Sequence, residues 1–186
     1  MTDVTALWLP ILVAGVFVFV VSSIIHMATP WHKNDYPRAP EEDKILDALR
    51  PFSIPPGAYF LPRPADMKDM GSPAFIEKLK RGPVLMLQVR KNGPDSMAPR
   101  LVLWFLYSLV VGVFAALVAG GALGSGAPYL AVFHYVALTS FAGYALAMVQ
   151  FSIWYDRPWS LTIKALIDGL IYALVTAGTF GWLWPR

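Results

Sequence analysis

Four stretches of this chain are apolar over about the length that a helix needs to cross the hydrocarbon core of a membrane, which is ~20 residues. They fall at residues 6–27, 101–121, 129–153 and 161–184. The composition agrees, because 56% of the residues are hydrophobic and 15% are charged, whereas a soluble domain is ~25% charged. We therefore predict an all-α integral membrane protein built as a four-transmembrane-helix bundle.

The connections between these stretches predict how the helices are arranged. The second and third are joined by the short, uncharged "GALGSGAP", and the third and fourth by the tight "YDRPWS", so consecutive helices should be antiparallel neighbours. The predicted organisation is a first transmembrane helix at 1–27, a hydrophilic segment at 28–100 and a transmembrane hairpin bundle of three helices at 101–186.

Lysine and arginine predict the orientation, because cationic loops are retained in the cytoplasm. Arg186 alone lies on one side. The other side carries Lys33, Arg38, Lys44, Arg81, Arg90, Lys91, Arg100, Arg157 and Lys164 near span ends. Residues 28–100 are therefore expected in the cytoplasm, with both termini outside. No positive charge precedes the first apolar run, "MTDVTALWLP", so we expect this span to remain as an anchor.

The hydrophilic segment holds twelve of the sixteen prolines, which restricts it to short elements. One short helix is predicted in "APEEDKILDALRP", with Pro40 at its first position. A second is predicted in "SPAFIEKLKRG", with Ser72 as N-cap, Pro73 at the first position and Gly82 as the stop. "PGAYFLPRP" and "PVLMLQVRKNG" have strand character and could pair into a small β ribbon. A proline-rich cytoplasmic cap and a partner-docking surface both fit this segment.

The fourth span carries a row of small residues at a spacing of four. Such a row lets another helix approach closely, so it predicts a packing face. Its members are Ala165, Gly169, Ala173, Ala177 and Gly181. The small residues that could face it on the second and third spans are Gly112, Ala116, Gly120, Gly143 and Ala147.

A polar row runs beside this ridge, also at a spacing of four. It consists of Ser160, Lys164, Asp168, Tyr172 and Thr176. An ionised carboxylate about two turns inside a span is costly unless it is paired or hydrated. We predict a cluster of Lys164, Asp168 and Gln150 that faces the bundle interior, with Tyr172 in the same row. Structural pairing, a proton, ion or solute site, and a cofactor contact remain open for Asp168.

Three histidines raise the question of a haem or a metal. His26 ends the first span on the cytoplasmic side, whereas His134 lies near the outer end of the third, so the two cannot share one iron. His26 and His32 both belong to the inner interface, in "HMATPWHKNDYPRAP". The sequence signals no third ligand beside them, so interfacial hydrogen bonding is favoured over a metal site.

The remaining motifs exclude much chemistry. The chain has no cysteine, so it has no disulfide, thiolate ligand or cysteine nucleophile. It shows no phosphate loop, HExxH or dinucleotide fingerprint, and no basic stripe for nucleic acid. Asp156 and Arg157, between interfacial aromatic residues, fit a salt bridge at the turn or a lipid contact. We predict no catalytic residue, no cofactor and no resident metal.

Three stretches carry a resemblance: "PWHKNDY", "LVLWFLYSLVVG" and "DGLIYALVTAGTFGWLWP". They resemble an uncharacterised family of small four-span bacterial inner-membrane proteins, and the similarity spans most of the chain. The resemblance implies a bacterial inner-membrane location and brings no activity or ligand with it.

Together these features favour a non-enzymatic membrane protein that docks on a partner or supports a larger complex. Its expected partners are the lipid bilayer and a membrane or cytoplasmic protein or a second copy of the chain, and not nucleic acid. The alternative is a small transporter or ion-coupled channel that uses Asp168, Lys164 and Gln150. A haem-binding redox subunit is a third, weaker hypothesis.

Overall fold

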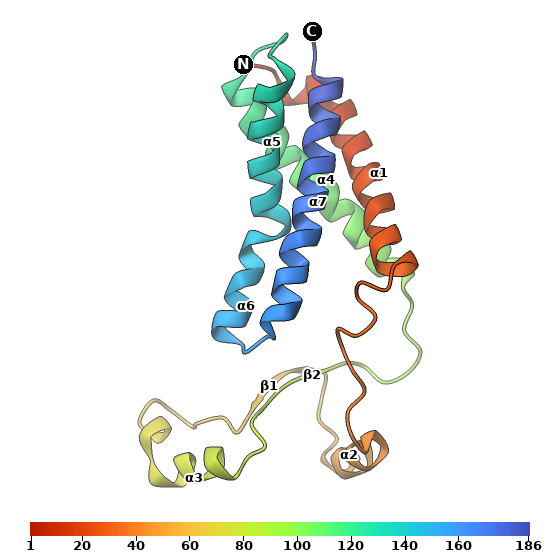
Figure 1. Cartoon of the computed structure of the whole chain (residues 1–186). Coiled ribbons are helices and arrows are strands. Elements are labelled where there is room, and N and C mark those ends of the chain that lie inside the picture. Colours follow the sequence, from red (N-terminus) through yellow and green to blue (C-terminus); the bar gives the residue numbers. More distant parts are fainter. The chain divides into compact units, whose positions relative to one another are not determined.

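A computed structural model describes all residues from Met1 to Arg186. The chain divides into two compact units (Figure 1). The helical unit consists of Met1–Tyr36 and Ser96–Arg186, and the loop unit of Pro37–Asp95. The helical unit thus takes in the residues just after the first span, which the sequence grouped with the hydrophilic segment.

The helical unit contains the four expected long apolar helices, each long and apolar enough to cross a membrane. The first comprises a 3₁₀ turn at Val4–Leu7, α1 at Trp8–Ser23 and a π-helical turn at Ile24–Ala28. The other helices are α4 at Ala98–Ala122, α5 at Tyr129–Tyr144, α6 at Val149–Trp154 and α7 at Trp159–Leu183. The predicted third span is therefore interrupted: α5 and α6 are separated by Ala145 and a 3₁₀ turn at Leu146–Met148.

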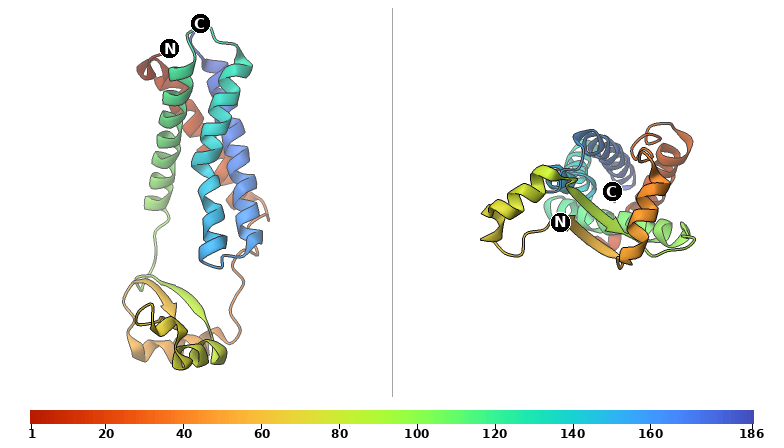
Figure 2. Two further views of the ribbon diagram at one scale, coloured as in Figure 1. Left: turned by 90° about the vertical axis from the view of Figure 1, so that its left-hand side faces the viewer. Right: turned by 90° about the horizontal axis from the view of Figure 1, so that it is seen from below.

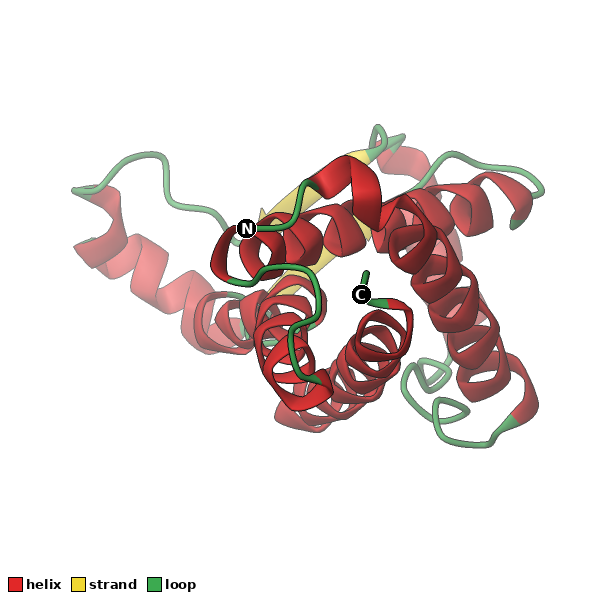
Figure 3. Cartoon of the chain, turned by 90° about the horizontal axis from the view of Figure 1, so that it is seen from above, coloured by secondary structure: helices red, strands yellow, loops and turns green.

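The four long helices form a closed ring. Helix α1 contacts α4 and α7, and α5 contacts the same two helices, an arrangement that Figure 3 shows from the end that carries both termini. The predicted helical bundle is thus confirmed. Helices α5 and α7 lie side by side along their length (Figure 2).

The apolar core fills the end of the bundle near the termini. Leu7, Val132, Phe180 and several alanines of α4 are completely buried there. Backbone hydrogen bonds close this end, since Thr2 N donates to Gly120 O at 2.8 Å and Gly126 N donates to Pro185 O at 2.8 Å. The opposite end has no comparable apolar filling, and the polar groups gather there.

The small ridge of α7 packs against α5. A Cβ built on Gly169 would lie 2.4 Å from Ala145 Cβ, and one on Gly181 would lie 2.6 Å from the Tyr129 ring. Ala173 and Ala177 between them are fully buried, whereas Ala165 is half-buried at the open end. The second-span glycines do not face this ridge: Gly112 meets Ile11 and Gly120 meets Thr2.

The loop unit contains α2 at Glu42–Leu49, β1 at Gly57–Leu61, α3 at Pro73–Arg81 and β2 at Leu85–Val89. The predicted ribbon is confirmed, because β1 pairs with β2 in antiparallel register. The caps of α3 are confirmed as well: Ser72 Oγ accepts from Phe75 N at 3.1 Å, and Gly82 ends the helix with φ +56°. Helix α2 begins later than Pro40, because Glu41 has φ +51°, which is not helical.

Candidate functional site

The residues that follow the first helix fold back onto the start of α7. We call residues 29–36 the interfacial segment. The π-helical turn ends at Ala28, and Pro30 cannot continue a helix. Two turns then form, with Lys33 N donating to Pro30 O at 3.1 Å and Asp35 N donating to His32 O at 3.2 Å. This compact path brings the side chains of the segment to the polar row of α7.

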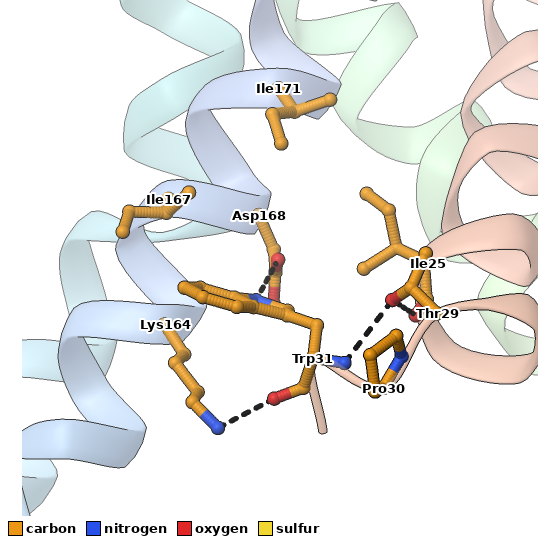
Figure 4. Close-up of a pocket in the computed structure, with 8 residues that line it drawn as sticks. All are labelled: Ile25, Thr29, Pro30, Trp31, Lys164, Ile167, Asp168 and Ile171. Carbon is orange, nitrogen blue, oxygen red and sulfur yellow. Dashed lines mark hydrogen bonds between the residues drawn. The ribbon is translucent and has the colours of Figure 1, made fainter. Parts of the chain in front are cut away.

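Asp168 is buried, with 5% of its surface exposed. The indole Nε1 of Trp31 donates a hydrogen bond to Asp168 Oδ1 at 3.0 Å (Figure 4). The imidazole Nε2 of His32 lies 2.9 Å from Asp168 Oδ2. That distance is within ion-pair range, but the two groups are not aligned as a hydrogen bond, and Nε2 is a buried atom without a hydrogen-bond partner. Both oxygens of Asp168 are thus approached from the interfacial segment.

Lys164 is bound to the interfacial segment and not to Asp168. Its ammonium forms an ion pair with Asp35 and donates to the backbone oxygen of Trp31 at 2.6 Å. It also lies 5.2 Å from the centre of the Trp31 ring, within the range of a cation–π contact. The expected pairing of Lys164 with Asp168 therefore does not form, because the interfacial segment supplies closer partners to both.

Gln150 does not take part in the cluster. It belongs to α6, its side chain is exposed, and it forms no side-chain hydrogen bond. The break between α5 and α6 separates it from the regular continuation of α5 that the sequence suggested. Tyr172, in contrast, is buried beside the cluster.

His26 joins the cluster through two contacts. Its ring stacks on His32, with centroids 4.2 Å apart and an angle of 20° between planes. Its Nε2 lies 3.3 Å from the hydroxyl of Tyr172. One ligand atom each of His26, His32 and Asp168 lie within 4.8 Å of one another. Asp168 of α7 is thus the third potential metal ligand, which the sequence did not signal.

Asp35 holds the other side of His32. Its Oδ2 lies 2.6 Å from His32 Nδ1, and its other oxygen is bound by Lys164. The hydrogen bonds from Lys164 and His32 hold the pKa of Asp35 below its ordinary value of 3.8, because both favour the ionised carboxylate. Asp35 is therefore anionic and accepts a hydrogen bond from Nδ1 of His32.

A cavity of about 380 Å³ borders the cluster. Its polar lining includes His26, His32, Asp35, Asp168 and Arg157, and its apolar lining includes helix residues such as Leu161. On the other side of Trp31, an apolar groove of about 650 Å³ lies between the end of the first helix and α7 (Figure 4). The cluster thus stands between a partly polar cavity and an apolar groove.

Aromatic side chains separate the cluster from the apolar core. Tyr172 packs edge-on against Trp104 and Tyr144, with centroids 5.7 Å apart in both pairs. Tyr107 packs against Tyr144 at 6.1 Å, and Trp104 Nε1 donates to Ser22 Oγ at 2.8 Å. This layer carries hydroxyl groups, so polarity decreases stepwise from the cluster to the core.

Of the other residues singled out from the sequence, Arg157 lines the cavity beside the cluster, whereas Asp156 and His134 lie outside it. Asp156 is exposed with φ +50°, and no ion pair joins it to Arg157. Backbone hydrogen bonds fix that turn instead, with Arg157 N donating to Phe151 O at 3.3 Å. His134 is exposed on α5 and makes no contact with the other histidines.

Two members of the cluster, Trp31 and Asp35, were not singled out as site residues from the sequence. Their signal was present: a tryptophan, a histidine and an aspartate follow a helix-ending proline in "PWHKND". What was missing is the direction of the chain after Pro30. Only the folded segment shows that these residues return to α7.

No protein-family model, curated protein or solved structure matches this chain. Its function therefore has to be inferred from its own residues and geometry.

Proposed function

We propose that the chain is a non-enzymatic, multi-pass protein of the bacterial inner membrane that docks a partner protein through its loop unit. Both termini lie outside in this proposal, and residues 28–100 lie in the cytoplasm. The excess of lysine and arginine on one side of the spans supports this orientation. The resemblance noted above supports the bacterial inner membrane.

The observation that carries the docking proposal is the exposure of apolar side chains in the loop unit. Phe75 is the one buried residue of this unit, at 7% exposed. Phe60 and Met86, which pair across the ribbon, are 50% and 53% exposed. Contiguous exposed apolar surface marks interaction sites, so this ribbon face is the proposed docking surface.

The short helices have the same character. Helix α2 exposes Ile45 and Leu46, and α3 exposes Ile76 and Leu79, which are three positions apart. Ile76 and Leu79 occupy one side of α3, whereas Ile45 and Leu46 are consecutive positions, about 100° apart around α2. A unit of this size that leaves its apolar faces uncovered gains stability when a partner covers them.

Cross-linking in native membranes tests the docking proposal. A photoreactive amino acid at Phe60 or Met86 should give one discrete adduct with another protein, and the same probe at exposed Ser125, in the α4–α5 connection, should give none. The double substitution Phe60→Asp with Met86→Asp should abolish co-purification of that protein while the full chain still elutes as one folded species. A chain that gives no adduct from the ribbon face would contradict docking there.

The cluster supports a second candidate function, ion-coupled transport or conduction. Its specific support is a chain of polar contacts that runs from Lys164 through Asp35 and His32 to Asp168. Ionisable groups within a membrane span often mark ion pathways. In proteoliposomes, Asp168→Asn should abolish any flux that the native chain supports, and Asp156→Asn should leave it intact. A flux that Asp168→Asn leaves unaltered removes Asp168 from such a mechanism.

A further inference from the structure

His32 Nε2 and Asp168 Oδ2 face each other as two hydrogen-bond acceptors when the imidazole is neutral. An ionised carboxylate only accepts hydrogen bonds, so His32 Nδ1, 2.6 Å from Asp35 Oδ2, carries a proton. In the neutral imidazole the other nitrogen, Nε2, is then an acceptor. That nitrogen is buried, lacks a hydrogen-bond partner and lies 2.9 Å from the Asp168 carboxylate. Two acceptors at this distance repel unless a cation lies with them.

The charges around this point also favour a cation. Asp35 and Asp168 contribute two carboxylates, and the ammonium of Lys164 is paired with Asp35. With neutral histidines these three groups carry one negative charge, and Arg157, which lines the bordering cavity, forms no ion pair with either carboxylate. A proton on His32 or a metal ion beside it would remove this excess.

Ligand chemistry distinguishes between cations. Magnesium and calcium prefer shells of oxygen atoms, whereas imidazole nitrogen suits zinc, copper, iron and nickel. Here two imidazoles and one carboxylate converge, with ligand atoms no more than 4.8 Å apart. We propose that His26, His32 and Asp168 bind one divalent transition-metal ion of the zinc class, with a fourth position open to water.

The groups behind the three ligands are those expected of a metal site. A metal-bound histidine usually donates its other N–H to a carboxylate, as His32 does to Asp35. The carboxylate ligand is itself hydrogen-bonded, because Trp31 Nε1 donates to Asp168 Oδ1 and leaves Oδ2 for the ion. These contacts fix the tautomer of one ligand and the orientation of another before a metal arrives.

His26 is the ligand that has to move. In a tetrahedral zinc site with bonds of about 2.0–2.1 Å, ligand atoms lie about 3.3 Å apart. Those of His32 and Asp168 already lie 2.9 Å apart, so any adjustment falls on His26. His26 is exposed, lies in the π-helical turn at the end of the first helix and borders the cavity. A tilt of its ring can bring its nitrogen to the ion. Metal binding would therefore link the end of the first helix to α7.

Direct binding measurements on the full chain test the site. The protein is purified in mild detergent through a tag without histidine, stripped of metal and titrated with Zn²⁺ alone, and bound metal is counted by mass spectrometry. Cobalt(II) serves as a spectroscopic probe, because a tetrahedral nitrogen and oxygen shell gives an intense visible band. We expect one saturable ion per chain and a cobalt band that zinc abolishes.

The variants His26→Gln, His32→Gln and Asp168→Asn should each weaken zinc binding at least tenfold, and His134→Gln, on the same chain outside the cluster, should not. Asp35→Asn should weaken binding about 10- to 100-fold through the orientation of His32. Thermal unfolding without metal shows whether each variant is folded, and exposed His26 gives the variant least prone to misfold.

Two results would overturn the proposal. One is the absence of saturable zinc binding by the native chain. The other is zinc binding that survives in both His32→Gln and Asp168→Asn. The measurement needs neither a partner nor a flux, so its outcome is separate from those of the docking and transport proposals.

Discussion

His32 Nε2 and Asp168 Oδ2 lie 2.9 Å apart, and this contact joins the segment after the first helix to the start of α7. Trp31 reaches the other oxygen of the same carboxylate. One buried acid thus holds two consecutive residues of the interfacial segment. The contacts with Asp168 hold the interfacial segment against α7 at the end of the bundle away from the termini.

Asp168→Asn should destabilise the helical unit. The amide can still accept from Trp31, but a hydrogen bond to a neutral acceptor contributes about 0.5–1.5 kcal/mol, against about 1.5–3 kcal/mol for one to a charged acceptor. We expect a loss of about 1 kcal/mol, measured as a lower midpoint of thermal unfolding in detergent. Asp156→Asn is the matched control. It changes an exposed acid with φ +50°, a conformation that asparagine tolerates, and it should leave the midpoint unchanged.

The contacts of Asp35 with His32 and Lys164 should make the stability of the folded chain depend on pH. Because the pKa of Asp35 is lowered in the folded chain, the contact contributes its full stability above the unfolded value. That contribution decreases as the pH falls below 3.8 and is lost below the folded pKa. Unfolding midpoints measured from about pH 7 to about pH 3 should fall more steeply for the native chain than for Asp35→Asn. Equal slopes for the two proteins would contradict the assignment.

Gly169→Ala should disturb the packing of α7 on α5. The added methyl group would lie 2.4 Å from Ala145 Cβ and 3.3 Å from its Cα, so the helices have to separate. Overpacking of this kind costs about 1–3 kcal/mol, which thermal unfolding can detect. Gly121→Ala in α4 is the control, because a Cβ there meets nothing within 4 Å and alanine is the better helix former. A Gly169→Ala protein as stable as Gly121→Ala would refute close contact at Gly169.

The absence of cysteine makes the orientation directly measurable. Single substitutions Ser125→Cys and Lys91→Cys place thiols at exposed positions, one in the α4–α5 connection and one in the loop unit. In spheroplasts, a thiol reagent that does not cross the inner membrane should label Ser125→Cys at once and Lys91→Cys only after permeabilisation. The reverse order would show that the loop unit faces outward.

Local pattern was enough to predict most elements of the fold, but not the break between α5 and α6, where a 3₁₀ turn lies at Leu146–Met148. A helix needs only a continuous apolar run of sufficient length, and a cap needs only Ser72, Pro73 and Gly82 at the correct spacing, so neighbours in sequence determine both. The strands around Phe60 and Met86 also follow from local residue types. The start of α2 differed from its prediction because Glu41 adopts a left-handed conformation that the favourable Pro40 did not indicate.

The sequence predicted the α7 side of the polar site but not the residues that contact it. A spacing of four placed Lys164, Asp168 and Tyr172 on one side of α7, and the cost of burying a carboxylate indicated that Asp168 needs partners. The sequence could not identify those partners. Helical spacing makes Lys164 a possible partner of Asp168, but it gives no information on residues that only the fold brings close. The fold decided it by returning Trp31 and His32 to Asp168.

The sequence by itself thus determined four apolar helices, a small ribbon and the side of α7 that carries the charges, since these depend on residue type and helical period. Tertiary structure alone decided that Asp35 takes Lys164, that His26 stacks on His32, and that Gln150 remains outside. These contacts depend on the direction of the chain after Pro30 and on the end of α5 at Tyr144. Both are set by tertiary packing, which brings together side chains that are distant in the sequence.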